Sequence, residues 1–251
     1  MLQVNKTNCY GCTACYSVCP KSAIKMKEDE RGFLYPEVIR EECVNCGLCE
    51  KLCCTQKYKK NEMPEAYAVK NKNDEIRMKS SSGGFFSLIA NKILEENGIV
   101  YGATYDKKFN VRHKRITKKQ ELDELRGSKY IQSDLKDSFK NVKEDLKADR
   151  KVLFVGTPCQ IYGLKKYLNN KEQEKLITLD LICHGVPSPK LWREFVQYIE
   201  KDNKSILKKF TFRNKKNGWR PSTLATFTNN VESNDKKIRS FFIMFNSDLP
   251  L

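Results

Sequence analysis

CYGCTACYSVCP at residues 9–20 and CVNCGLCEKLCC at residues 43–54 decide how the first part of the chain folds. Both stretches have the spacing C-x2-C-x2-C-x3-C, which is typical of cysteines that hold [4Fe-4S] clusters. Three cysteines wrap one face of a cubane, and the fourth serves the other cluster of the pair. We therefore predict two ligand sets: Cys9, Cys12, Cys15 and Cys53 for the first cluster, and Cys43, Cys46, Cys49 and Cys19 for the second.

Zinc is the alternative to iron at these cysteines. Zinc sites use paired C-x2-C knuckles and have no use for a third and fourth cysteine at these offsets. The doubled run also indicates a repeated loop-plus-helix unit whose core is largely the clusters, so we expect it to be unfolded without iron. Cys54 stands where proline would end the second run, as Pro20 ends the first. The sequence leaves open whether Cys54 is a spare thiol, an alternative ligand or inert, although the spacing favours Cys53.

The length and cysteine usage indicate an intracellular protein of two domains. The chain has 251 residues, enough for a small metal-stapled module and an α/β domain with its own core. It lacks the run of about 18 apolar residues that would span a membrane, and its start lacks the apolar segment of a signal peptide. We therefore expect a cytoplasmic protein without a membrane span. The 11 cysteines are odd in number and mostly fall in the two runs, which favours metal ligation over disulfides.

The net charge of +16 is concentrated after the cysteine runs. Residues 1–62 hold 10 Lys and Arg against 8 Asp and Glu, whereas the rest of the chain holds 37 against 23. Nucleic-acid binding is one interpretation, but no unbroken block of five basic residues supports it, and we expect no nucleic acid. A basic face would attract an acidic ferredoxin or flavodoxin-type electron donor by electrostatic steering. A solvated, lysine-rich surface is the plainer alternative.

A polar, charged stretch at residues 55–65 is typical of a linker. We place a domain boundary near residue 62, between a two-[4Fe-4S] ferredoxin-type domain over 1–62 and a second domain over 63–251. From residue 66 onward, strand-like apolar runs alternate with amphipathic helical ones, which is typical of an α/β domain. The predicted fold class is an α+β ferredoxin-like two-[4Fe-4S] module followed by an α/β domain.

Two glycine-containing segments of the second domain are candidates for binding a phosphate. Ser82, Gly83 and Gly84 precede apolar residues at helical spacing, and exposed amides at a helix start form a cradle for phosphate. The segment Gly127–Tyr130 places Lys129 beside a glycine, where its ammonium group would suit a phosphate. An ordinary capped helix and a solvated lysine are the plainer interpretations, and each signal is weak by itself.

A cysteine follows the predicted strand 151–155. Thr157 takes the cap position and Pro158 the first position of the next helix, so Cys159 lies in its first turn. We expect the helix dipole to lower the pKa of this thiol. Cys159 is therefore a candidate metal ligand or redox thiol, and the alternative is a buried small hydrophobe.

The same pattern recurs after the predicted strand 176–182, where Cys183 and His184 precede a helix capped by Ser188. Ligands bind at the carboxyl ends of strands in open α/β sheets, which makes both residues candidates for the catalytic region. His184 would donate to a cofactor ring or relay a proton, and the alternative is a hydrogen bond that holds the turn.

Four segments of the second domain, taken together, resemble a known family. They are SSGGFFS from residue 81, GSKYIQS from 127, VLFVGTPCQIYGLKKYL from 152 and LDLICHGVPSPKLW from 179. In this order behind the cysteine runs, they resemble the coenzyme F-420 (deazaflavin) hydrogenase/dehydrogenase beta-subunit family, in its branch with an N-terminal two-cluster ferredoxin domain. The resemblance covers nearly the whole chain.

This resemblance implies an FAD-dependent, iron–sulfur oxidoreductase with a flavin-binding α/β domain. It implies that FAD is bound by Ser82, Gly83, Gly84, Gly127, Ser128, Lys129 and Tyr130, with Cys159 and Cys183 close to it. Family members normally carry a further C-x2-C pair downstream, plausibly completing a third cluster with these two cysteines. This sequence has no such pair before Leu251, so we expect an incomplete C-terminal part and a third cluster only if that segment were present.

The function expected from residues and resemblance together is electron transfer. A ferredoxin-type donor reduces the two clusters, the clusters feed FAD, and FAD delivers two electrons to a small organic acceptor, deazaflavin-like or other. The alternative is a non-catalytic electron carrier that docks partners and lacks flavin.

Overall fold

The repeat seen in the cysteine runs is a repeat of local structure. The computed structural model describes residues 2–53, 64–169, 174–216, 218–219, 222–239 and 241. Helices α1 (Ala14–Val18) and α2 (Leu48–Lys51) each begin two residues after the second cysteine of a run. Between them lie the antiparallel pair β1 (Ile24–Glu28) and β2 (Leu34–Val38) and the short helix η1 (Arg40–Glu42). Cys54 and the expected boundary near residue 62 lie outside the described residues.

The second part of the chain is built on a four-stranded sheet in the order β4-β3-β5-β6. Its strands are β3 (Ile99–Tyr105), β4 (Val111–Ile116), β5 (Val152–Gly156) and β6 (Leu176–Asp180). Strands β3, β5 and β6 run parallel, and β4 is antiparallel to β3. The helices around it are α3 (Asp74–Lys79), α4 (Phe85–Glu95), η2 (Lys119–Glu121), α5 (Leu122–Leu125), α6 (Ser138–Lys147) and α7 (Pro158–Tyr167).

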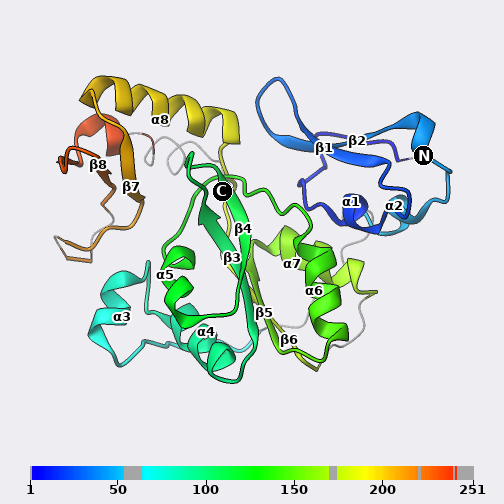
Figure 1. Ribbon diagram of the computed structural model, residues 1–251, viewed down its shortest axis with the longest axis horizontal. Helices are drawn as coiled ribbons and strands as arrows, with labels where there is room; N and C mark the ends of the chain where they lie inside the picture. Colours follow the sequence, from blue (N-terminus) through cyan, green and yellow to red (C-terminus); the bar gives the residue numbers. More distant parts are fainter. Residues whose placement is uncertain are drawn as a thin grey trace.

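Helices cover both faces of the central strands (Figure 1). Val152 and Phe154 of β5 pack with α6 and α7 on one face, whereas Leu153 and Val155 pack with α4 and α5 on the other. A strand buried on both faces reads as a continuous apolar run instead of an alternating one. This is why the run at 151–155 predicted a buried strand.

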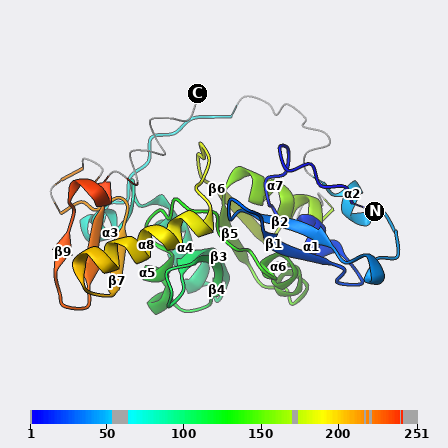
Figure 2. The same ribbon diagram turned by 90° about the horizontal axis from the view of Figure 1, so that it is seen from above.

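The chain then adds a small antiparallel sheet beyond helix α8 (Pro189–Asn203). It consists of β7 (Leu207–Thr211), β8 (Leu224–Phe227) and β9 (Glu232–Ser233), in that order. Trp192 of α8 is 1% exposed at the centre of an aromatic cluster, and its Nε1 donates to the Phe109 carbonyl oxygen at 2.7 Å. In both views this sheet lies at one end of the molecule and the cysteine-rich module at the other (Figure 2).

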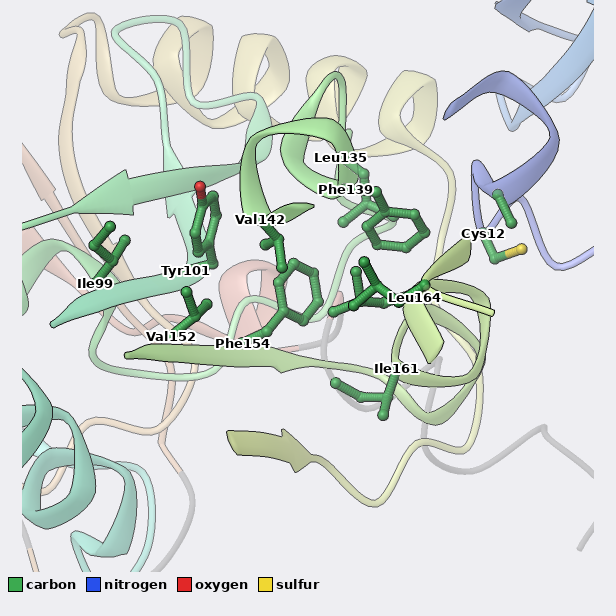
Figure 3. Close-up of a cluster of buried hydrophobic side chains, with 12 residues drawn as sticks. Cys12, Ile99, Tyr101, Leu135, Phe139, Val142, Val152, Phe154, Ile161 and Leu164 are labelled. Carbon is green, nitrogen blue, oxygen red and sulfur yellow. The ribbon is translucent and has the colours of Figure 1, made fainter. Parts of the chain in front are cut away.

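The cysteine-rich module is packed into the core of the α/β domain. Cys12 and Ala14 belong to the same buried cluster as Phe139, Phe154 and Leu164, and Figure 3 shows Cys12 at the edge of that cluster. Polar contacts also join the module to the domain. Tyr16, in α1, donates its hydroxyl proton to Asp137 Oδ1 at 2.9 Å. Arg193, in α8, binds Glu28 of β1 through two contacts of 2.7 Å. The two parts therefore form one continuous packed structure.

Within the part of the chain that the structure describes, we find no helix with the length and apolar character needed to cross a membrane.

Candidate iron–sulfur and electron-transfer site

Two cavities in the module are each lined by four of the eight run cysteines. The larger, of about 420 Å³, is lined by Cys9, Cys12, Cys15 and Cys53. The smaller, of about 20 Å³, is lined by Cys19, Cys43, Cys46 and Cys49. Each cavity thus contains three cysteines of one run and the fourth of the other, which is the grouping predicted from the spacing. The assignment of these thiols as cluster ligands stays a prediction.

The thiols of the first set lie close enough to influence one another. Burial, followed by the neighbouring Cys12 and Cys9 thiols, raises the pKa of Cys15 strongly, and burial also raises the pKa of Cys9. Among the described residues, no three or more His, Cys, Asp or Glu side chains are gathered tightly enough to hold a single metal ion. Four soft sulfur donors around a cavity fit a [4Fe-4S] cubane, in which each thiolate binds a different iron.

Left-handed backbone positions let the chain turn around each cavity. Thr13 (φ 61°) and Gly47 (φ 72°) occupy equivalent places, directly after the second cysteine of each run and before the helix. Backbone N–H groups also point at sulfur: Ala23 donates to Cys19 Sγ at 3.3 Å. Such bonds orient the thiols and tune the group they bind.

The first cysteine set lies against helix α7. Cys12 is 9% exposed, and a Cβ placed on Gly163 of α7 would lie 3.1 Å from Cys12 Sγ. A larger residue at position 163 would force Cys12 or α7 to move by a few tenths of an ångström. Cys159, in the first turn of the same helix, is close enough to Cys9 and Cys12 to interact electrostatically with both. Gly163 had no signal of its own in the sequence, because a helical glycine is informative only when its neighbour is known.

The structure confirms the turns around Cys159 and Cys183 but corrects one expectation. Thr157 and Gln160 form a capping box with Pro158 at the start of α7, and Ser188 Oγ accepts from the Leu191 N–H at the start of α8. Burial raises the pKa of the Cys159 thiol, so the expected lowering by the helix dipole was wrong. Desolvation outweighs the dipole, because a thiolate beside other thiols in a dry site is costly.

Cys159 and Cys183 follow the neighbouring parallel strands β5 and β6, and they are close enough to interact electrostatically. Cys159 is partly buried, whereas Cys183 is exposed and its Sγ lies 3.8 Å from the Gly185 carbonyl oxygen. His184 is exposed beside it. The structure thus brings the two cysteines to one edge of the sheet, next to the first cysteine set, and leaves the role of His184 a prediction.

The two segments expected to bind a phosphate lie side by side. The N–H and hydroxyl of Ser128 donate to Ser81 Oγ at 2.7 and 3.0 Å, which joins the segment Gly127–Tyr130 to the residues before α4. Gly84 caps α4 with φ 82°, and a Cβ on Gly127 would meet no atom within 4 Å. For a phosphate, this arrangement provides hydroxyl groups, the N-terminus of the 11-residue helix α4 and open space.

Lys129 and Gly83 have structural roles at this place. Lys129 Nζ donates to the carbonyl oxygens of Glu124 and Arg126, both at 2.9 Å, and burial lowers the pKa of Lys129 to about 7. A Cβ on Gly83 would lie 2.7 Å from the Val69 carbonyl oxygen. Lys215, which the sequence did not single out, donates to the Ser82 carbonyl oxygen at 3.1 Å and holds the loop.

A two-cluster ferredoxin-type module packed against an α/β domain indicates that the chain is an iron–sulfur protein. Comparison with known proteins identifies its family. Residues 8–57 match the model of the 4Fe-4S dicluster domain. Residues 66–140 and 149–241 match the models of the N-terminal and C-terminal parts of the coenzyme F420 hydrogenase/dehydrogenase beta subunit. The chain belongs to the coenzyme F420 hydrogenase/dehydrogenase beta-subunit family, as its four motifs predicted.

One curated relative and one solved structure resemble most of the chain. The chain is 23% identical over 185 residues to a subunit of the F(420)H(2) dehydrogenase of Methanosarcina mazei, and the match covers 70% of this chain and 53% of the relative. The chain therefore spans about half the length of that protein. It is also similar to a chain of the F420-reducing [NiFe] hydrogenase complex from Methanosarcina barkeri, with 20% identity, a TM-score of 0.44, and coverage of 65% of this chain and 57% of that one.

The cysteine-rich module has relatives of its own. It is 40% identical over 52 residues to an uncharacterized ferredoxin of Methanocaldococcus jannaschii, covering 21% of this chain and 66% of the ferredoxin. It is 36% identical over 52 residues to the VorC subunit of the ketoisovalerate oxidoreductase of Methanothermobacter marburgensis, covering 20% of this chain and 66% of that protein.

Proposed function

We propose that this chain is an iron–sulfur flavoprotein that passes electrons from a ferredoxin-type donor through two [4Fe-4S] clusters to FAD. FAD then reduces a small organic acceptor, deazaflavin-like or other. The family supports the acceptor class, because its description names coenzyme F420. Clusters of this kind carry single electrons, and flavin converts them to the two-electron chemistry of an organic acceptor.

The observation that supports the proposal most is the packing of the first cysteine set against the α/β domain. Cys12 is buried against Gly163 of α7, and Cys159 in the same helix is a close neighbour of that set. A cluster held there would lie beside the carboxyl ends of the parallel strands, where open α/β sheets bind ligands. This position supports the proposal that the module exchanges electrons with the domain.

The second cysteine set faces the donor in this proposal. Cys46 is exposed, and its neighbours Val44 and Leu48 are 58% and 39% exposed. An apolar patch around a cluster near the surface suits brief docking of a small electron carrier. The excess of basic residues downstream would draw an acidic ferredoxin or flavodoxin toward the molecule.

FAD would be held between the two joined segments of the α/β domain. Ser82 and Gly84 at the start of α4, with Gly127 and Ser128 opposite, supply amides and hydroxyls for its phosphates. Cys159, Cys183 and His184 would then lie on the reacting side. Two relatives are subunits of larger enzymes by their names, and we extend the proposal to stable partner subunits for this chain.

The first test is the content of iron, acid-labile sulfide and FAD in the anaerobically purified full chain. We expect about eight iron and eight sulfide per chain, since each cluster contributes four of each, together with one FAD. The variant Gly127→Asn, which tolerates the left-handed backbone at this position (φ 80°) and fills the open space beside Ser128, should lose FAD and keep its iron.

A chain with about eight iron and no flavin, even after addition of FAD, would contradict the flavoprotein proposal. It would instead support a non-catalytic electron carrier that docks partners.

A further inference from the structure

Thr13 breaks the symmetry of the two cysteine runs. It lies between Cys12 and Cys15, as Gly47 lies between Cys46 and Cys49, and both residues adopt the left-handed conformation. Glycine adopts this conformation at no steric cost, whereas a β-branched threonine there is strained. Among the described non-glycine residues with positive φ, Thr13 is the β-branched one, and such an outlier motivates a hypothesis of function.

The hydroxyl of Thr13 is buried without a partner. Thr13 is 4% exposed, and across the described residues its Oγ1 finds no hydrogen-bond partner. It takes the N-cap position of α1 but makes no capping bond there. A buried hydroxyl that bonds to nothing is destabilising, so such groups usually face an ion, a water or a ligand.

The group that this hydroxyl faces is indicated by the cavity that Thr13 lines. Cys9, Cys12, Cys15 and Cys53 line the same cavity, and they are the first predicted ligand set. Sulfur atoms of a [4Fe-4S] centre accept hydrogen bonds, and those bonds help to set its reduction potential. A donated proton stabilises the extra negative charge of the reduced form, which raises the potential.

We propose that Thr13 Oγ1 donates a hydrogen bond to a sulfur of the cluster in this cavity and raises its reduction potential. The inference rests on the proposed function, because it requires the two clusters. Gly47, the equivalent residue at the second cluster, has no side chain to donate, although Asn45 also lines that cavity. A raised potential at the first cluster favours transfer of one electron from the reduced second cluster, near exposed Cys46, to the oxidised first cluster beside α7. No bond forms or breaks in this step.

The test is a redox titration followed by electron paramagnetic resonance on the anaerobic full chain. Thr13→Val keeps the branched shape and removes the hydroxyl, Thr13→Gly also relieves the strain, and Thr13→Ser keeps a donor. In the Val and Gly variants, the equilibrium constant for reducing one cluster should fall threefold to tenfold. A tenfold fall corresponds to a reduction potential lower by about 59 mV for a one-electron couple. The reduction potential of the other cluster should not change, and both potentials of the Ser variant should resemble those of the original chain.

Ser17 supplies the matched control. Its hydroxyl, in α1, is also buried without a partner among the described residues, but Ser17 does not line the cavity. Ser17→Ala should leave both potentials unchanged. If Thr13→Gly binds about eight iron with both potentials unchanged, the inference is overturned and the proposed function stands. An original chain without about eight iron would overturn both. If Thr13→Val fails to bind iron, Thr13→Gly decides the matter.

Discussion

His113 on β4 shows how a single buried side chain ties together the elements around the candidate site. Its Nε2 lies 3.0 Å from the Val155 carbonyl oxygen, and its Nδ1 lies 3.1 Å from Ser133 Oγ. Gln160 of α7 donates to the same Ser133 oxygen at 2.9 Å. The Val155 carbonyl oxygen can only accept, so Nε2 carries a proton, and in the neutral ring Nδ1 accepts the hydroxyl proton of Ser133. Burial, together with the charge of Lys129, lowers the pKa of His113 to about 4.

We predict that the imidazole of His113 stays neutral down to a pH of about 4. The unfolded chain takes up this proton near pH 6.5. The contribution of His113 to the free energy of unfolding is therefore fully present above that value, and up to about 3 kcal/mol of it is lost as the pH falls toward 4. The chain has 2 histidines, so an NMR titration of a His184→Gln variant follows His113 alone. A ring that titrates near its ordinary value would contradict the buried network.

Residues of the candidate site were predictable where chemistry demands a pattern. The eight run cysteines line two cavities in the groups of four that cubane spacing predicts, and their role as ligands stays a prediction. Thr13 was not singled out, since its importance depends on a backbone angle and a missing hydrogen bond. Comparison of the two runs, which places Thr13 opposite Gly47, would have revealed it. Lys129 was expected to face a phosphate, but it turns inward to backbone carbonyl oxygens.

At the scale of elements, helix α7 joins the two halves of the molecule. Its start was predictable from Thr157 and Pro158, because capping is a local interaction. Its partner was not, because the contact between Gly163 and Cys12 joins residues far apart in the chain. Similarly, the sequence indicated alternating strands and helices, but it did not single out β4, which forms an antiparallel hairpin with β3, or the small sheet beyond α8.

We predict that Gly163→Val pushes α7 away from α1. The added side chain would meet Cys12 at 3.1 Å, and overpacking of this kind typically costs about 1–3 kcal/mol. The Tm should therefore fall by roughly 2–4 °C for each kcal/mol, which heating at a fixed rate with cluster absorbance as the signal would measure. Lys165→Val, on the exposed side of the same helix, is the control. Equal Tm values for the two variants would rule out a tight contact.

At the scale of the whole molecule, a glutamine and an ion pair fasten the module to the domain. The Gln132 side chain accepts from the Leu34 N–H at 2.8 Å and donates to the Leu34 carbonyl oxygen at 3.3 Å. Its backbone N–H donates to the Pro187 carbonyl oxygen at 3.1 Å, which links β2 to the loop that follows Cys183. The pair between Arg193 and Glu28 is bidentate but about one third exposed.

We predict that Gln132 stabilises the contact between module and domain more than the ion pair of Arg193 and Glu28 does. Loss of its side-chain amide removes two partly buried hydrogen bonds, each of about 1 kcal/mol, whereas an exposed ion pair contributes about 0–1 kcal/mol. In Gln132→Ala, hydrogen exchange at the Leu34 amide should therefore become about tenfold faster or more. Arg193→Ala should change it little, as should the control Lys27→Ala, which removes an exposed pair with Glu37. Equal acceleration in the first two variants would contradict this ranking.

Because Cys12 is buried with residues of the α/β core, we expect capture of iron by the module to complete that core. We expect the module to be unordered in a chain that has not acquired its metal, which would uncover the buried side chains of Phe139, Phe154 and Leu164 on one side. Exposed apolar surface and an unfolded segment are what cellular proteases recognise. We therefore expect the lifetime of newly made protein to follow the supply of iron, so that scarcity of iron lowers the amount of the chain.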